Sequence, residues 1–125
     1  MTFLEYMRRH PLLYYWLPLV GWMALIFFLS AQPDFPQPQA RWLDRLLSYG
    51  AHMFLFGVLA VLWARALGQQ ALAWLVALAL TAAYALSDEF HQSFVPGRCA
   101  DPMDLLWDLL GALLALGLWA WWRRG

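Results

Sequence analysis

One segment of the chain gathers side chains that could do chemistry. Residues 87–108, with the sequence SDEFHQSFVPGRCADPMDLLWD, hold five carboxylates, one arginine and one histidine. Carboxylates beside a histidine suit general acid–base catalysis. An arginine among carboxylates suits recognition of a phosphate or carboxylate group on a ligand. A further histidine, His52, lies in an apolar stretch earlier in the chain, so these residues together are candidates for a functional site.

The last three carboxylates have a spacing that fits one face of a helix. Asp101, Asp104 and Asp108 are separated by three and then four residues, so they project from the same face of a helix that begins just after Asp101. Asp101 suits the N-cap. Asp108 lies about 9 Å along the helix, a depth at which an ionisable group in a membrane suggests function. Gly111 and Ala115 continue this face and predict close approach of another helix.

Two other expected helices carry polar side chains to the same level. His52 lies about 9 Å along a helix expected to begin near residue 46, so its depth matches that of Asp108. On the next helix Thr81, Tyr84 and Asp88 share a face, which continues for one more turn. We therefore predict one polar pocket between three helices. Its ligand-binding candidates are His52, Asp88, Glu89, His91, Gln92, Arg98, Asp104 and Asp108.

Arg98 lies in a loop that can fold its guanidinium group over the helix ends. It could pair with one of the aspartates of the pocket, or it could bind an anionic group of a ligand. The carboxylates with His52 and His91 could instead hold a divalent metal, although no spacing as specific as His-Glu-x-x-His occurs. We expect no metal and no cofactor, with a divalent metal as the alternative.

The composition is that of an integral membrane protein. Of the 125 residues, 63% are hydrophobic, 13% are charged and nine are tryptophan, which is too apolar for a soluble domain of this size. Four apolar stretches approach the length of about 20 residues that a helix needs to cross the hydrocarbon. The sequence predicts an all-α fold: one domain over residues 1–125, a bundle of transmembrane helices at 12–31, 46–67, 70–90 and 103–122. The proline-rich segment QPDFPQPQAR is expected to be an external loop.

The arginines predict how the helices are oriented. One side of the membrane is expected to carry Arg8, Arg9, Arg65, Arg123 and Arg124, and the other side only three arginines. Because positively charged loops stay inside, both termini are predicted to be cytoplasmic, in a multi-pass protein of the cytoplasmic membrane. The pocket then faces outward. The chain has no lysine and a net charge of zero, so nothing indicates a nucleic-acid partner, and its single cysteine, Cys99, has no second cysteine to pair with.

The polar segment resembles the signature of the VanZ-like family of small membrane proteins. That signature reads roughly Asp-Glu-x-x-Gln-x-Phe-x-Pro-x-Arg, followed by Asp and a Gly-Ala pair. A second block, AHMFLFGVLA, resembles the family's Ala-His pair, which opens the second helix and is followed by an aromatic residue. The matching residues are Ala51, His52, Phe56, Asp88, Glu89, Gln92, Phe94, Pro96, Gly97, Arg98, Asp104, Gly111 and Ala112.

The chain also departs from this pattern. Tyr49 and Leu55 stand where many members of the family carry Lys and Glu, and Phe56 replaces a frequent Tyr. Asp108 stands where Asn is common. We therefore expect no mechanism that requires that Lys or Glu. The family is named for a protein that raises resistance to teicoplanin-type glycopeptide antibiotics, so the resemblance implies a role in the cell envelope and a link to that process.

Three interpretations of the pocket stay open. It could bind or modulate an envelope component, such as a lipid-linked cell-wall precursor or a lipid head group, with Arg98 holding an anionic group. It could belong to a membrane-embedded enzyme that acts on a lipid-linked or phosphorylated substrate, with Asp88, His52 and Asp108 as the catalytic candidates. It could also be a buried ion network that fixes helix packing. Apart from the lipid bilayer, a second copy of this chain or another membrane protein could be a partner.

Overall fold

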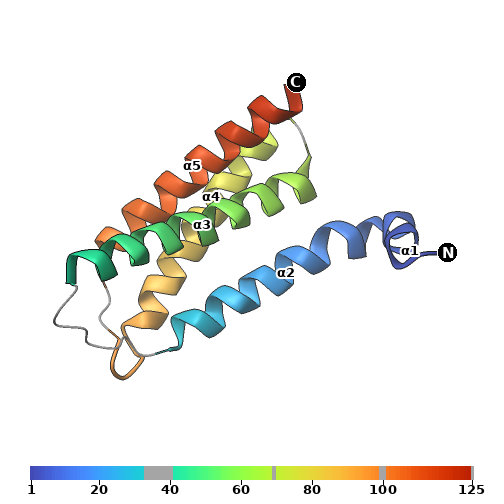
Figure 1. Cartoon of the computed structure of the whole chain (residues 1–125). Helices are drawn as coiled ribbons and strands as arrows, with labels where there is room; N and C mark the ends of the chain where they lie inside the picture. Colours follow the sequence, from blue (N-terminus) through green and yellow to red (C-terminus); the bar gives the residue numbers. More distant parts are fainter. Residues whose placement is uncertain (33–40, 69, 99–100, 125) are drawn as a thin grey trace.

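The computed structural model describes residues 1–32, 41–68, 70–98 and 101–124, and it is built from helices (Figure 1). The helices are α1 (Phe3–Arg9), α2 (Pro11–Ser30), α3 (Arg41–Leu67), α4 (Ala71–Gln92) and α5 (Met103–Arg124). These residues contain no strand, which confirms the all-α prediction. Most of the expected proline-rich loop, together with Cys99, lies outside the described residues.

Four of the helices, α2 to α5, are long and apolar enough to cross a membrane, as predicted. They provide spans of 20 to 26 residues with a mean hydropathy of 1.6 to 1.9, and about 20 residues suffice to cross the hydrocarbon. Large apolar side chains such as Phe27, Phe54, Leu86 and Leu118 are exposed on the outside of the bundle. An apolar exterior is what lipid requires, so the chain is a multi-pass membrane protein.

Three helices, α3, α4 and α5, run further than the apolar stretches predicted, whereas α2 covers Pro11–Ser30 where residues 12–31 were expected. The α3 helix begins at Arg41 rather than near residue 46, and α4 continues past residue 90 to Gln92. The α5 helix ends at Arg124 rather than at residue 122. Hydropathy finds only the part of a helix that lies in hydrocarbon, whereas polar residues with good helix propensity extend it beyond that part.

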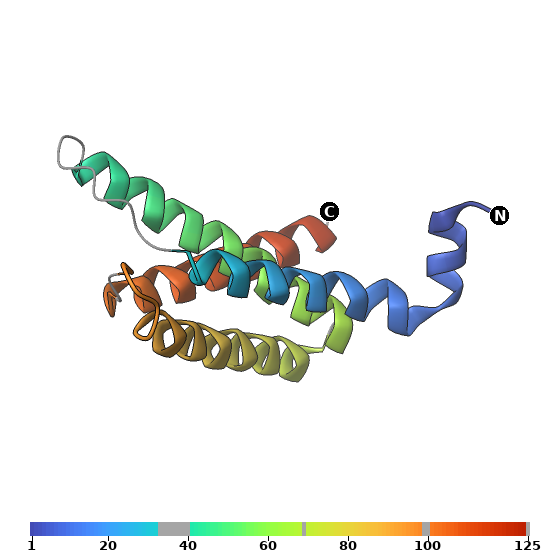
Figure 2. The same cartoon turned by 90° about the horizontal axis from the view of Figure 1, so that it is seen from below.

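The short helix α1 was not predicted. It begins with a reciprocal capping box: the Thr2 hydroxyl accepts a hydrogen bond from the Glu5 amide at 3.2 Å, and the Glu5 carboxylate accepts one from the Thr2 amide at 2.7 Å. The Thr-x-x-Glu pattern in the sequence was the available signal. The α1 helix lies at an angle to α2 (Figure 2), which begins with Pro11 in its first turn.

The tightest helix contact joins α3 and α5. A Cβ atom added at Gly111 would lie 2.3 Å from the carbonyl oxygen of Met53, and one added at Gly57 would lie 3.0 Å from the carbonyl oxygen of Gly111. The two backbones therefore meet where neither helix has room for a side chain, as the sequence predicted for Gly111. This contact fixes the rotation of α5 that turns its aspartates toward α3.

The α4 helix packs through small side chains on one stripe, at Ala73, Ala77, Thr81 and Ala85, all of them buried. Their spacing of four residues keeps them on the same side of the helix. The Thr81 hydroxyl donates to the carbonyl oxygen of Ala77 within its own helix at 2.8 Å. The Thr81 hydroxyl is therefore hydrogen-bonded within its own helix and is not part of the pocket.

Two hydrogen bonds attach the middle of α2 to α3 and α4. The Trp22 indole donates to the carbonyl oxygen of Leu55 on α3 at 2.8 Å, and the Tyr84 hydroxyl on α4 donates to the carbonyl oxygen of Met23 at 2.6 Å. Leu19 is also buried against the core. These contacts hold the middle of α2 in place beside α3 and α4.

We expect Tyr84→Phe to lower stability by about 1 kcal/mol, the usual net value of one hydrogen bond. The loss is small because the Met23 carbonyl keeps its place in the helical hydrogen-bond ladder. Circular dichroism in detergent should show a melting temperature lower by about 2 to 5 °C. Tyr6→Phe is the control, because Tyr6 is exposed on α1. Equal melting temperatures of the Tyr84→Phe protein and the wild type would contradict the proposed attachment of α2.

The two ends of the bundle differ. Both chain termini lie at one end, whereas α2 and α4 end, and α5 begins, at the opposite end (Figure 1). The predicted pocket residues lie at this second end, which we call the pocket end. The cytoplasmic location of the termini stays a prediction, and an outward-facing pocket follows from it.

Candidate functional site

The centre of the site is a buried histidine held by two carboxylates. His52 of α3 places Nδ1 2.7 Å from the Asp108 carboxylate and Nε2 3.5 Å from the Asp104 carboxylate, both on α5. His52 and Asp108, expected at the same depth, are therefore in direct contact. A carboxylate that accepts from one imidazole nitrogen fixes the orientation of the ring. Phe56, one turn further along α3, lies parallel to this ring with centroids 6.4 Å apart.

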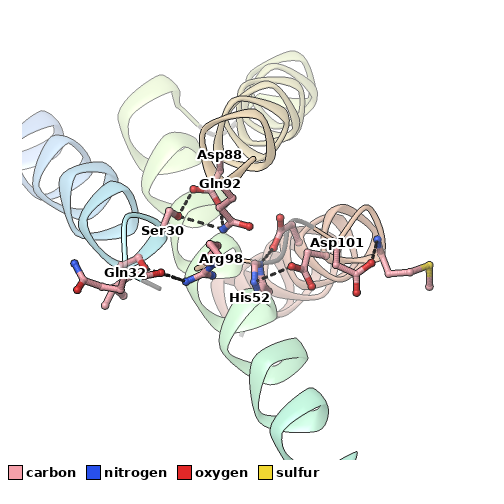
Figure 3. A network of polar contacts seen from close by, with 11 residues as sticks. Ser30, Gln32, His52, Asp88, Gln92, Arg98 and Asp101 are labelled. Carbon is pink, nitrogen blue, oxygen red and sulfur yellow. Dashed lines mark hydrogen bonds and ion pairs between the residues drawn. The ribbon is translucent and has the colours of Figure 1, made fainter. Parts of the chain in front are cut away.

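A second polar group joins α2 and α4. The Ser30 hydroxyl donates to the Asp88 carboxylate, whose second oxygen accepts from the Gln92 side-chain amide at 3.1 Å (Figure 3). The Gln92 amide also lies 3.4 Å from the Ser30 hydroxyl oxygen. All three side chains are buried. The Gln92 carbonyl oxygen has no hydrogen-bond donor within the described ranges, so it can accept from a ligand.

Arg98 closes the end of α2. Its Nη1 atom donates to the carbonyl oxygens of Leu29 at 3.2 Å and Gln32 at 3.1 Å. A cation is favourable there because the last carbonyls of a helix carry partial negative charge. Figure 3 shows the guanidinium group between the Ser30 group and His52. The loop thus folds back over the helix ends, and the arginine uses backbone carbonyls as acceptors.

These groups surround one cavity of about 250 Å³ at the pocket end. Polar side chains from α2, α3, α4 and the loop line it together with apolar ones from α2 and α3. The lining residues are Ile26, Leu29, Ser30, Ser48, Ala51, His52, Leu55, Phe56, Asp88, Gln92 and Arg98. Asp104 and Asp108 lie behind His52 and do not line the cavity. The cavity wall therefore carries one carboxylate, one guanidinium, one imidazole and several hydrogen-bonding groups.

The structure does not bring every candidate to the cavity. The His91 ring stacks on Phe27 of α2 with centroids 4.4 Å apart and does not line the cavity. Glu89 is half-buried, and being one position from Asp88 it points to another face of α4. Asp101 accepts a hydrogen bond from the Met103 amide at 3.0 Å, which confirms it as the cap of α5. Neither His91 nor Glu89 lines this cavity. Their role as ligand contacts stays a prediction.

Sequence reasoning missed the contribution of two serines, Ser30 and Ser48. Ser30 ends the long apolar run of α2, and that position was its only signal. A serine at the end of a membrane helix commonly bonds to its own backbone, so the pattern alone did not suggest a partner on another helix. Ser48 lies near the start of the helix expected at residues 46–67, and its position gave no signal that it lines a cavity.

The structure shows what two of the residues that depart from the family pattern contact. Tyr49, which stands in place of a frequent Lys, stacks on Trp107 of α5 with centroids 4.8 Å apart. Leu55, in place of a frequent Glu, contributes an apolar wall to the cavity. Tyr49 therefore contributes to helix packing and Leu55 to the shape of the cavity. The polar groups of the cavity come from its other lining residues.

In the part of the chain that the structure describes, no group of three or more His, Cys, Asp or Glu side chains is arranged to hold a metal ion. His52 and the two α5 aspartates contact one another directly instead. The expectation of a protein without metal or cofactor stays a prediction.

Comparison with known proteins places the chain in a family. No curated protein and no solved structure matches the chain. The model of the VanZ/LLP1 family matches residues 15–123, which include all four membrane-capable helices almost completely. This match confirms the resemblance seen in the polar segment. The chain belongs to the VanZ/LLP1 family.

Proposed function

We propose that the cavity at the pocket end binds the polar head group of an envelope lipid, either a phospholipid or a lipid-linked cell-wall precursor. The observation that carries this proposal is a cavity of about 250 Å³, lined by polar side chains of three membrane-capable helices and by Arg98. Ionisable groups inside membrane helices are costly and mark functional sites by default. A packing network would fill such a space with its own side chains.

The size and lining of the cavity favour a head group over a larger ligand. Its volume equals about eight water molecules at 30 Å³ each, below the range of drug-sized pockets. Arg98 would hold a phosphate oxygen with its fork of N–H donors. Ser30, His52 and Gln92 would hydrogen-bond to hydroxyl or amide groups of the same head group. The lipid chains and any larger saccharide would remain outside the cavity.

Binding of this kind connects to the process that the family resemblance implies. A protein that holds the head group of a cell-wall precursor changes how much of that precursor is accessible at the outer surface. Susceptibility to teicoplanin-type antibiotics would then depend on Arg98 and His52. The outward orientation predicted from the arginines is a condition of this link.

The experiment is native mass spectrometry of the protein released gently from its own membranes. We expect the wild type to carry a lipid of defined mass and Arg98→Gln to retain at least about tenfold less of it, equivalent to about 1.4 kcal/mol. The matched control is Arg45→Gln, because Arg45 is an exposed arginine in the first turns of α3, the same charge change outside the cavity. The mass of the lipid distinguishes a phospholipid from a cell-wall precursor. Equal lipid occupancy in all three folded proteins would contradict the proposal.

A second function, catalysis, is favoured by one specific contact. The pair formed by His52 Nδ1 and Asp108 at 2.7 Å has the form of a general acid–base group with its orienting carboxylate. His52 would activate water toward a phosphate ester or pyrophosphate held by Arg98. A turnover assay on lipid phosphates and lipid-linked saccharides tests this function. Product formation that disappears in His52→Ala would establish an enzyme, and absence of product from every substrate would remove this candidate.

A further inference from the structure

A second cavity lies at the end of the bundle that carries both termini. Its volume is about 510 Å³, and it is bordered by the start of α2, the end of α3 and the end of α5. The side chains that define its character are two arginines and four aromatic residues: Arg65, Arg123, Tyr14, Tyr15, Trp119 and Trp122. None of these residues belongs to the cavity at the pocket end, so we call this one the arginine cavity.

Aromatic rings hold both guanidinium groups in place. The Arg65 guanidinium carbon lies 5.2 Å from the Tyr14 ring centre and 5.6 Å from that of Tyr15, and the Arg123 carbon lies 5.4 Å from the Trp119 ring centre. These distances are those of cation–π contacts. A guanidinium group over a ring face keeps its N–H donors at its edge, where they can bind an acceptor.

The charge balance of this end favours an anion. No carboxylate is among the residues that line the arginine cavity. Of the acidic residues that the structure describes, only Glu5, on α1, lies at this end of the bundle, and its carboxylate caps α1. The other described acidic residues lie toward the pocket end, on α3, α4 and α5 and at Asp101 just before α5. Two arginines in one cavity without a lining carboxylate are complementary to a phosphate group.

An apolar groove adjoins the arginine cavity. It has a volume of about 620 Å³ and lies between α4 and α5, where Trp74, Leu75, Leu78, Leu113 and Leu116 line it. Arg123 borders both the groove and the arginine cavity. A ligand with a phosphate at Arg123 could therefore lay an acyl chain along the groove, which a free phosphate ion would leave unused. Basic pockets between transmembrane helices are known to bind anionic lipid head groups.

We propose that the arginine cavity binds the phosphate group of an anionic phospholipid, with Arg65 and Arg123 as donors and one acyl chain in the groove between α4 and α5. This site is independent of the proposed function, because it lies at the opposite end and shares no residue with the other cavity. With the predicted orientation, its lipid belongs to the cytoplasmic leaflet.

The test is a native mass spectrometry titration of the delipidated protein with three probes. Phosphatidylglycerol is anionic, phosphatidylcholine carries no net charge, and glycerol 3-phosphate is a soluble phosphate without acyl chains. We expect the wild type to bind phosphatidylglycerol at least about tenfold more tightly than either of the others. Phosphatidylcholine binding as tight as phosphatidylglycerol would overturn the charge argument. Glycerol 3-phosphate binding as tightly would show a phosphate site that does not require the groove, and would overturn the lipid assignment.

Substituted proteins test whether the lipid binds at the arginine cavity. Arg65→Gln/Arg123→Gln should bind phosphatidylglycerol no more tightly than phosphatidylcholine, whereas Arg8→Gln/Arg9→Gln, with the same charge change on exposed α1 residues, should match the wild type. Arg65→Lys/Arg123→Lys keeps the charge and should retain part of the preference, which separates charge from misfolding. Arg98→Gln should leave this preference unchanged, so the two sites are tested separately. An unchanged preference in Arg65→Gln/Arg123→Gln would overturn the proposal.

Discussion

Gly111→Ala is expected to destabilise the protein strongly, although it adds a single methyl group. The new Cβ would lie 2.3 Å from the carbonyl oxygen and 2.5 Å from the Cα of Met53, both of them backbone atoms that cannot move by side-chain rotation. The α3 and α5 helices would have to separate. Overpacking costs about 1 to 3 kcal/mol or more, which exceeds the gain of about 0.5 to 1 kcal/mol from replacing a helical glycine by alanine.

Thermal unfolding in detergent, followed by circular dichroism, measures this effect. We expect the melting temperature of Gly111→Ala to fall by about 5 °C or more. Gly117→Ala is the control on the same helix, because a Cβ there meets nothing within 4 Å, and it should be neutral or slightly stabilising. Gly57→Ala should fall between the two, since its Cβ would meet neighbours at 3.0 and 3.1 Å. If Gly111→Ala and Gly117→Ala melted alike, the close contact of α3 and α5 would be wrong.

Asp108→Asn is expected to reduce head-group binding by about tenfold while the protein stays folded. The ionised carboxylate only accepts hydrogen bonds, so it holds Nδ1 of His52 as a donor at 2.7 Å. An asparagine amide has the same size but can also donate, so the ring is no longer held in one tautomer and one orientation. Residues that orient another contact residue commonly matter by an order of magnitude or more.

Lipid occupancy by native mass spectrometry and melting temperature, measured on the same samples, separate the interpretations of the network. Asp101→Asn is the matched control, because asparagine caps a helix as well as aspartate does and this residue lies at the start of α5. Lower lipid occupancy with a melting temperature near that of wild type would support a binding role. A large fall in melting temperature with unchanged occupancy of the folded protein would favour the interpretation of a buried network that fixes helix packing.

The two ends of the bundle carry different chemical groups. The pocket end combines carboxylates, His52 and Arg98 around a small cavity, whereas the opposite end carries arginines and aromatic rings. Both cavities are lined by α2 and α3, whereas α4 lines only the cavity at the pocket end and α5 only the arginine cavity. The bilayer is then both the solvent of the protein and the source of its ligands.

Sequence patterns alone predicted the four spans, the helical class and many residues of the candidate site. Hydropathy and span length are local properties, so α2 to α5 could be located without tertiary information. Helical periodicity placed Asp104 and Asp108 on one face with Gly111, and the rise per residue matched the depth of Asp108 to that of His52. Both inferences hold because they depend on one helix at a time, or on two helices that enter from the same side.

The contacts between side chains of different helices could not be predicted from sequence patterns. Ser30 joins Asp88 because α2 ends beside α4, and Arg98 finds the carbonyls of Leu29 and Gln32 because the loop returns over that end. His91, one turn from Asp88 on the same expected face, instead stacks on Phe27. The rotation of each helix about its own axis depends on where the backbones approach most closely, and no single-helix pattern contains that information.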